Sequence, residues 1–419
     1  MEGSSTSKGD LLVRVEDLLI QIFVCLPVIS LLRFKTVCKS WRAIIESSDF
    51  IHRHAINNND SAATNKLGTF IFQYNRLGVT NRGRHRLPHF FVLSSSSGSS
   101  TTTSNDDYPW LYKDLGIPIG DMVLERERPV RMVASCHGII CFYQKLSRDI
   151  ALWNPATKQF RFLPKSLPLP EGKFGRFLSD YVGFGFDTLT KDYKVLLITS
   201  FDSDYEETKK KNAVQVYYVR TNSWRWCVNI DLPTYCISRS NTAHNHGVYL
   251  NGHYLLLAFQ FYATLDDDGE SCIGRETVVI SFDLSNETYR IIPAPTDDDV
   301  RLDIRGKDGK IVCVTHLLPD DRKCQVYLLN DDNGYSWTKL YETNMYQPHS
   351  CLGPMAISND GLCGFLRGSD GYGLMSYNLE TQEMRDIQIP NVSFSDVLVQ
   401  TAHIYKESLV SICANDTTL

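Results

Sequence analysis

The sequence predicts an α+β multidomain chain, in which a small module of three short helices precedes a large all-β, propeller-like domain. Three observations lead to this prediction. Apolar residues recur at helical spacing over residues 16–54, and the rest of the chain alternates short apolar runs with Gly, Pro, Asn and Asp turns. One strand–turn–aromatic unit also recurs within the second region. The length of 419 residues allows one small and one large unit.

The composition excludes a disordered or fibrous chain, because 43% apolar and 11% aromatic residues supply ample surface to bury. The 12 cysteines are scattered without a CxxC pair, which disfavours a zinc ribbon or a thioredoxin-type site. We therefore expect reduced, buried cysteines in a cytoplasmic or nuclear protein. Glu16 and Asp17 abut the apolar run 18–32 and Pro27 interrupts it, so we expect neither a secretory signal nor a membrane anchor.

Residues 11–54 make up the expected helical module. Apolar residues at three- and four-residue spacing from Leu18 to Leu26 indicate a first helix of about ten residues. Ser30 can cap a second short helix, and a third carries Trp41. So small a unit falls below the size that normally folds alone, so part of its apolar surface must meet something else. Periodicity leaves two alternatives open, packing on the rest of the chain or binding to an obligate partner.

The segments around this module are assigned from their polarity. We expect a flexible N-terminus at 1–10, a linker at 55–67, the β domain at 68–413 and a tail at 414–419. Within the β domain, residues 94–107 are rich in Ser and Thr and predict a low-complexity loop.

The recurring unit is an apolar strand, a polar turn and an aromatic or other large residue that begins another apolar step. Its five copies align on Phe160, Trp224, Tyr289, Trp337 and Met384. The intervals of 64, 65, 48 and 47 residues bracket one four-stranded propeller blade of about 50 residues. A turn that leads into an apolar strand precedes several copies, at 136–143, 250–259, 307–314 and 359–366. Five irregular repeats favour a propeller over a β-sandwich.

Signatures of enzymes and metal sites are weak. The run Gly183-Phe184-Gly185-Phe186 lacks a third glycine and a following helix, so it predicts a close-packed strand. The sequence has no GxSxG elbow, Walker loop or HExxH motif. The pairs His52/His54 and His244/His246 lack Cys or carboxylate partners at metal-ligand spacing. We therefore expect no catalytic centre, no cofactor and no metal.

Acidic side chains cluster in four expected loops. The clusters are Asp202, Asp204 and Glu206; Asp266, Asp267 and Asp268; Asp297, Asp298 and Asp299; and Asp331-Asp332. They are either simply solvated or form an electrostatic docking surface for a basic partner. Residues 55–419 carry a net charge of −6, which is −5 for the chain less −1 for residues 1–13 and +2 for residues 14–54. With that charge and no basic stripe, a nucleic-acid partner is disfavoured.

Residues 14–54 closely resemble a plant F-box, with the Leu26-Pro27 pair, the SLLRFK stretch and VCKSW at Val37 to Trp41. The resemblance implies that the apolar face docks on a Skp-family adaptor, which joins the protein to a cullin scaffold, and it favours the partner alternative. The adaptor contacts that it implies are Val15, Leu18, Ile22, Leu26, Pro27, Leu31, Val37 and Trp41. Family members usually begin the motif with Leu-Pro where Arg14-Val15 stand, which predicts a weaker adaptor contact.

The β region resembles the F-box-associated, kelch-like interaction domain of plants, through residues 153–157, 183–195, 221–225 and 281–290. The segment 44–58 and the ending 405–412 are similar to S-locus F-box proteins of pollen. These resemblances imply a non-catalytic substrate receptor of an SCF ubiquitin ligase, with non-self S-RNases, which are basic as a class, as targets. Two alternatives stay open: the same architecture acting on an unrelated target in stress or developmental signalling, and a propeller enzyme or sugar-binding module.

Overall fold

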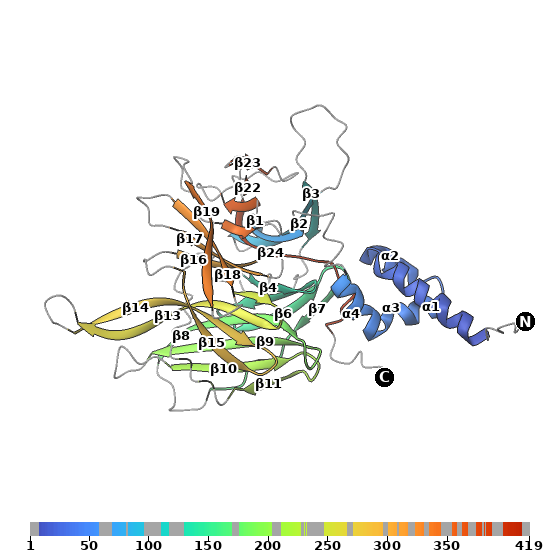
Figure 1. Cartoon of the computed structure of the whole chain (residues 1–419), viewed down its shortest axis with the longest axis horizontal. Helices are drawn as coiled ribbons and strands as arrows, with labels where there is room; N and C mark the ends of the chain where they lie inside the picture. Colours follow the sequence, from blue (N-terminus) through green and yellow to red (C-terminus); the bar gives the residue numbers. More distant parts are fainter. Residues whose placement is uncertain are drawn as a thin grey trace, which may run out of the picture.

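The computed structural model begins with four helices, and strands follow (Figure 1). It describes residues 8–57, 69–80, 83–95, 110–116, 130–169, 176–202, 211–227, 230, 232, 247–265, 271–295, 301–307, 310–316, 323–330, 335–344, 354–357, 363–367, 374–378, 381, 383–387 and 397–412. After Asn57 these residues contain no helix, as the sequence predicts. The expected linker at 55–67 begins too early, because residues 55–57 belong to the last helix; the rest of it and most of the low-complexity loop lie outside the described residues.

The helical module consists of α1 (Lys8–Val24), α2 (Val28–Phe34), α3 (Lys39–Glu46) and α4 (Ser48–Asn57). Helix α1 starts inside the segment that the sequence assigns to a flexible N-terminus. Because Arg14 and Val15 replace the usual Leu-Pro pair, no proline limits the helix to a start at this point. Helix α2 follows Pro27, whose backbone is extended, so Ser30 lies within the helix and is not its cap.

The fourth helix is an addition to the three that the sequence predicts, and Ser47 accounts for it. The Ser47 hydroxyl donates a hydrogen bond to the Ile44 carbonyl at 2.8 Å and accepts one from the Phe50 amide at 3.3 Å. It therefore ends α3 and caps the start of α4 within one residue. The Ser47 backbone is extended (φ −66°, ψ 140°), which breaks a run that looks like one continuous helix in the sequence.

The described strands form six four-stranded antiparallel sheets, which we call blades 1 to 6. Blade 1 contains β24 (Val397–Ile404), β1 (Thr69–Thr80), β2 (Gly83–Ser95) and β3 (Trp110–Gly116); blade 2 contains β4 (Arg131–Cys136), β5 (Ile139–Gln144), β6 (Asp149–Asn154) and β7 (Gln159–Phe162); blade 3 contains β8 (Arg176–Asp187), β9 (Asp192–Asp202), β10 (Lys211–Tyr218) and β11 (Ser223–Trp226). Blade 4 contains β12 (Val248–Leu250), β13 (His253–Leu265), β14 (Ser271–Asp283) and β15 (Thr288–Pro293); blade 5 contains β16 (Arg301–Lys307), β17 (Lys310–His316), β18 (Lys323–Asn330) and β19 (Ser336–Asn344); blade 6 contains β20 (Pro354–Ile357), β21 (Cys363–Arg367), β22 (Leu374–Asn378) and β23 (Met384–Asp386).

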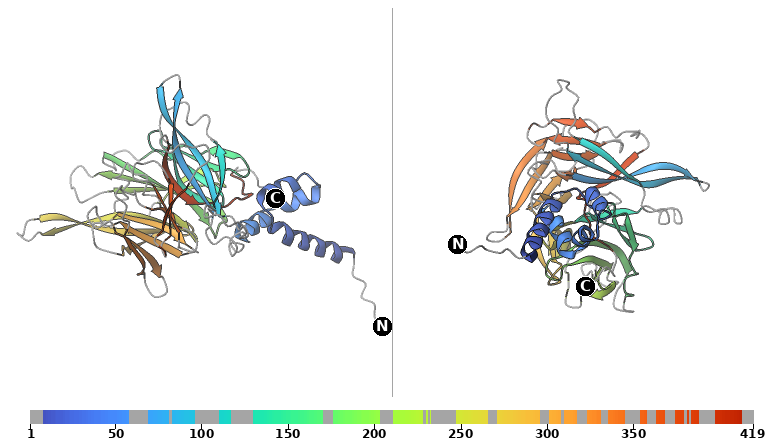
Figure 2. Two further views of the ribbon diagram at one scale, coloured as in Figure 1. Left: turned by 90° about the horizontal axis from the view of Figure 1, so that it is seen from above. Right: turned by 90° about the vertical axis from the view of Figure 1, so that its right-hand side faces the viewer.

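The blades form a closed ring around their first strands. Strand β4 contacts β8, β8 contacts β12, and the series continues through β16, β20 and β24 back to β4. The chain therefore closes its propeller with its last strand, because β24 pairs with β1. The five sequence repeats fall on the third and fourth strands of blades 2 to 6, which confirms the propeller prediction. Figure 2 shows the ring from the side that carries the helices.

The two ends of the blades form two opposite faces. Strand direction alternates within a blade, so turns between the first and second strands and between the third and fourth strands lie at the same end. We call this end the proximal face; it includes the turns at 137–138, 155–158 and 188–191. The other end, where β9, β13 and β15 finish, is the distal face.

Close packing between blades 3 and 4 explains the glycine run at 183–186. A Cβ atom at Gly183 would lie 2.6 Å from the Tyr254 ring, and one at Gly185 would collide with Tyr249. The run is thus a packed strand, as predicted. Among cysteines whose side chains are described, Cys136, Cys141 and Cys313 are buried as expected, whereas Cys25 and Cys38 are exposed.

Candidate functional site at the exposed helix stripe and the distal face

Helix α1 is apolar on two sides. Leu19, Phe23 and Val24 pack into the core of the helical module. Three other apolar residues, spaced three and four apart, remain in solvent: Val15 is 50% exposed, Leu18 57% and Ile22 54%. This α1 stripe is continuous along the helix surface. A chain of this size rarely leaves large aliphatic side chains aligned in water without a partner.

The other residues implied by the F-box resemblance are placed less uniformly. Val37, between α2 and α3, and Pro27 are exposed, whereas Leu26 and Trp41 are half-buried. The Trp41 ring packs on Phe23 at a centroid distance of 5.1 Å, so it is largely a core residue. Leu31 is 0% exposed, so its assignment as a direct adaptor contact is wrong, and it supports the module from within.

One exposed apolar residue of the module is absent from the sequence assignment. Ile29, on α2, is as exposed as the stripe residues. The run from Val28 to Leu32 is apolar apart from Ser30, so its spacing does not show which side chain points outward. Only the packing of α2 on α3 distinguishes the buried Val28 and Leu31 from Ile29.

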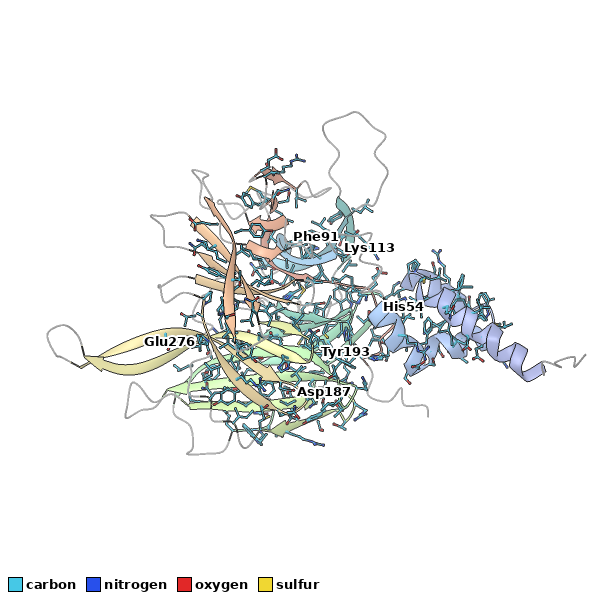
Figure 3. All side chains as sticks on the ribbon, viewed as in Figure 1. His54, Phe91, Lys113, Asp187, Tyr193 and Glu276 are labelled. Atoms are coloured by element: carbon cyan, nitrogen blue, oxygen red, sulfur yellow. The ribbon has the colours of Figure 1, made fainter. Side chains whose placement is uncertain are left out.

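The helical module rests on the proximal face through α4. The His52 ring lies 6.0 Å from the Phe186 ring at the end of β8, and Ile51 packs against both the helical core and the blade core. The side chain of His54 is buried, and its Nε2 atom lies 2.9 Å from the Leu26 carbonyl oxygen, within hydrogen-bonding distance. Figure 3 shows His54 where the helices meet the blades.

The segment Tyr405–Ile412, which we call the C-terminal strap, joins the two parts. Lys406 donates a hydrogen bond from Nζ to the Ala55 carbonyl at 2.6 Å, near the end of α4. On the propeller side, the Asn154 amide donates to the carbonyls of Ser408 (3.1 Å) and Val410 (2.7 Å). The strap therefore makes hydrogen bonds to both parts.

His137 is a titratable group at this junction, and its side chain is partly buried. Its ring Nδ1 lies 3.1 Å from the Tyr193 hydroxyl. Burial, together with the positive charge of Lys406 and the neighbouring His52, lowers the pKa of His137 from 6.5 to about 4. The folded chain thus holds this imidazole in its neutral form at neutral pH.

Acidification should consequently destabilise the chain through His137. The unfolded chain binds a proton near pH 6.5 and the folded chain only near pH 4, so this contribution to stability is lost as pH falls between those values. We expect a loss of about 2 kcal/mol between pH 7 and pH 5. His137 has a positive φ of 45°, which asparagine tolerates, so His137→Asn is the matched variant. Urea unfolding midpoints measured at pH 7 and pH 5 should fall less on acidification in the variant than in the wild type. An equal fall in both proteins would contradict the assignment of the acid sensitivity to His137.

Three of the acidic clusters lie where strands end at the distal face. Asp202 is the last residue of β9, and its backbone pairs with Arg176. Its side chain lies outside the described residues, as do Asp204, Glu206, Asp266, Asp267, Asp268, Asp297, Asp298 and Asp299. These residues come directly after β9, β13 and β15. The pair Asp331-Asp332 also lies outside the described residues, and its flanking strands β18 and β19 meet at the proximal face.

The described part of the distal face holds a rigid polar cluster beneath exposed apolar side chains. Arg148 pairs in bidentate fashion with the buried Asp180, at 2.7 and 2.8 Å, and the Tyr143 hydroxyl donates to the same carboxylate at 2.5 Å. The guanidinium lies 5.5 Å from the ring centroid of Phe177, which is exposed, as is Leu146. No sequence pattern predicts this cluster, because Arg148 and Asp180 meet only through blade packing.

Two hairpins extend beyond their blades. Strands β1 and β2 pair with each other as far as Thr80 and Gly83, whereas β24 accompanies β1 only to Arg76. This blade 1 hairpin carries Arg76, Arg84 and Arg86 and no acidic residue, a local basic element that the sequence analysis did not single out. The β13–β14 hairpin leads into Asp266 to Asp268 and points away from the helices (Figures 1 and 3).

Among residues with described side chains, no three His, Cys, Asp or Glu residues gather as a metal site. His244 and His246 lie outside the described residues. No described helix combines the length and apolarity needed to cross a bilayer.

A small helical module carries an apolar stripe that no described residue covers, and it is fixed to one end of a propeller whose other end holds no described helix; this arrangement is typical of a two-part binding protein. Residues 15–53 match the F-box domain, and residues 80–403 match the F-box associated beta propeller domain. The chain therefore belongs to the family of F-box proteins with an associated β-propeller. This family assignment supports a substrate-recognition role in an SCF complex.

The chain is similar at low identity to proteins of Arabidopsis thaliana. An F-box/kelch-repeat protein is 26% identical over 338 residues, which cover 77% of this chain and 78% of the relative. The F-box protein CPR1 is 24% identical over 413 residues, which cover 96% of this chain and 89% of the relative. The similarity thus extends over both the helices and the propeller.

Proposed function

We propose that this chain is a non-catalytic substrate receptor of an SCF ubiquitin ligase, acting in the cytoplasm or nucleus. Its F-box, helices α1 to α4, binds a Skp-family adaptor and through it a cullin, and the propeller binds a protein target. The observation that carries the proposal is the α1 stripe, in which Val15, Leu18 and Ile22 are each at least 50% exposed on a module that packs most of its other apolar side chains. A docked adaptor would cover that stripe.

Such a receptor works by proximity. It performs no bond chemistry and raises the local concentration of target lysines beside a ubiquitin-charged enzyme that is carried elsewhere in the assembly. The F-box occupies the proximal face, so the distal face is the surface on which a target has room. The exposed Phe177 and Leu146 there offer apolar contacts next to the fixed Arg148.

A basic protein is the target class that we favour. Acidic segments follow β9, β13 and β15, whose ends share the distal face, and opposite charge increases the rate and specificity of association. Non-self S-RNases are the basic proteins to which the resemblance with pollen S-locus F-box proteins points. The shared ending 405–412 has a packing role as the strap, so the target proposal rests on the acidic segments alone.

Charge reversal at the acidic segment after β13 tests this target class. Changing Asp266, Asp267 and Asp268 to lysine should weaken binding of a purified S-RNase at least about tenfold at low salt, and less at high salt. Arg84→Glu with Arg86→Glu in the blade 1 hairpin is the matched control and should not weaken binding. Biolayer interferometry at two salt concentrations gives the comparison. Equal affinities for the wild type and the Asp266–Asp268 variant would exclude this segment as a docking surface for the S-RNase.

An unrelated target is the remaining alternative, and affinity purification from the native tissue with the proteasome inhibited separates the two. Recovery of the adaptor together with an S-RNase supports the favoured target. Recovery of the adaptor with a different ubiquitin-modified protein supports a signalling role. Absence of the adaptor would contradict the SCF assignment.

A further inference from the structure

The hydrophobic core of the F-box contains one residue from the opposite end of the chain. Leu409 is 4% exposed and is buried in the same cluster as Phe23, Leu31 and Ile45. Ala156, from the proximal turn of blade 2, packs partly against this cluster. The other buried members of the cluster all come from α1 to α4. The four helices therefore do not complete their own core.

The strap sends its apolar side chains alternately into different cores. Leu409 enters the F-box, whereas Val410 and Ile412 enter the core shared by blades 2 to 4. Tyr405 enters the core between blades 1 and 2. Neighbouring positions 409 and 410 thus belong to two different parts of the molecule.

Blade 2 makes its own hydrogen bonds and close contacts to the strap, in addition to those made by the helices. The Ser408 hydroxyl donates to the His137 carbonyl at 2.5 Å, and Arg161 donates to the Ile412 carbonyl at 2.9 Å. Gly138 lets the strap approach closely, because a Cβ atom there would lie 2.9 Å from the Ser408 nitrogen and would collide with the Lys406 carbonyl. Leu409 is therefore held at a set place under the helices.

We propose that the C-terminal strap is a working part of the adaptor-binding module, with Leu409 as a positioning residue for the α1 stripe. Leu409 packs in one cluster with Phe23 and Val24, which share α1 with the exposed Leu18 and Ile22. The strap directly follows β24, which closes blade 1. A chain whose propeller is not closed therefore lacks the last piece of its F-box core. The inference rests on the proposed function, because the Skp-family adaptor is the ligand.

The physical consequence is a link between a buried residue and the affinity of a distant surface. Removing the Leu409 side chain leaves a cavity beneath the helices and raises the population in which they open locally. The observed dissociation constant rises by the factor by which the folded fraction falls, because only that fraction binds the adaptor. Val410 offers a matched control on the adjacent residue, since its side chain packs against the blades.

The experiment uses the full chain as wild type, Leu409→Ala and Val410→Ala. Hydrogen exchange of α1 to α4 is measured without adaptor, and adaptor affinity is measured by titration calorimetry. In Leu409→Ala we expect amide exchange in α1 to accelerate about tenfold and the adaptor affinity to fall at least about threefold. In Val410→Ala we expect both to stay at wild-type values. Wild-type exchange and affinity in Leu409→Ala would overturn the inference.

Two further comparisons keep the outcome decisive. If Leu409→Ala is not recovered as a folded protein, the milder Leu409→Val is measured in the same way, and again an unchanged exchange rate and affinity overturn the inference. A wild-type chain that does not bind the adaptor contradicts the proposed function itself. A wild-type chain that binds, together with a Leu409 variant that binds equally well, contradicts only the role of the strap.

Discussion

Replacing both Leu18 and Ile22 with aspartate is expected to abolish capture of the full chain by a Skp-family adaptor while the propeller stays folded. Both side chains are more than half exposed, so the substitutions cost the free chain little. In the complex each aspartate would be buried against an apolar surface without a partner. A combined loss of about 4 kcal/mol corresponds to roughly a thousandfold in affinity.

Co-purification and titration calorimetry with the purified adaptor measure this effect. Leu111→Asp is the matched control, because Leu111 on β3 is exposed to the same degree as Leu18 but lies outside the F-box. Circular dichroism of all variants checks that the propeller is intact. Wild-type adaptor affinity in the double variant would show that the α1 stripe is not the docking surface. Trp41 and Leu26 are poorer choices for this test, since both pack into the helical core.

Lys194→Met is expected to destabilise the propeller by about 3–5 kcal/mol, because it breaks a buried ion pair from one side. Lys194 is 2% exposed, and its Nζ lies 3.0 Å from the Asp187 carboxylate and 2.9 Å from Glu287. It also donates to the Leu284 carbonyl at 2.6 Å, so it joins blade 3 to a turn of blade 4. Without the Lys194 ammonium, the buried negative charge of Asp187 loses its nearest positive partner.

Asp187 gives this prediction its control. Burial raises the pKa of Asp187, but hydrogen bonds from Ser285, Thr190 and Lys194 outweigh it and hold the pKa below its usual range. Asp187→Asn removes the charge and keeps an oxygen for the Leu189 and Thr190 amides. Adding it to Lys194→Met should recover part of the loss in the urea midpoint. If the free energy of unfolding of Lys194→Met lies within about 1 kcal/mol of the wild-type value, the structural role of the ion pair is contradicted.

Five of the six blades could be predicted from the sequence because each has its outer hairpin in one continuous stretch. The turns repeat a local pattern, in which Asn154 and Asp283 each accept hydrogen bonds from amides two and three residues later. Blade 1 gave no such signal, since its strands come from residues 69–116 and from 397–404 at the other end of the chain. Its closure depends on a pairing that no local pattern records.

The adaptor surface was predictable in its outline. Helical spacing indicates that α1 is apolar, and the F-box resemblance implies Leu18 and Ile22 as adaptor contacts, which are exposed. The resemblance also implies Leu31 on α2, but it does not show which apolar side chains of that helix point inward, and Leu31 is buried. The strap could not be found in this way. Its apolar side chains enter three cores that are built from distant parts of the sequence, so 405–412 looks like an ordinary apolar ending.

The most direct test of the central claim is ubiquitin transfer in an assembly reconstituted from the adaptor, the cullin with its conjugating enzyme, the full chain and the target recovered from tissue. We expect modification of target lysines with the wild-type chain and with Leu111→Asp, and none with the Leu18→Asp, Ile22→Asp variant. Undiminished modification with that double variant would contradict a receptor that joins the ligase through the α1 stripe.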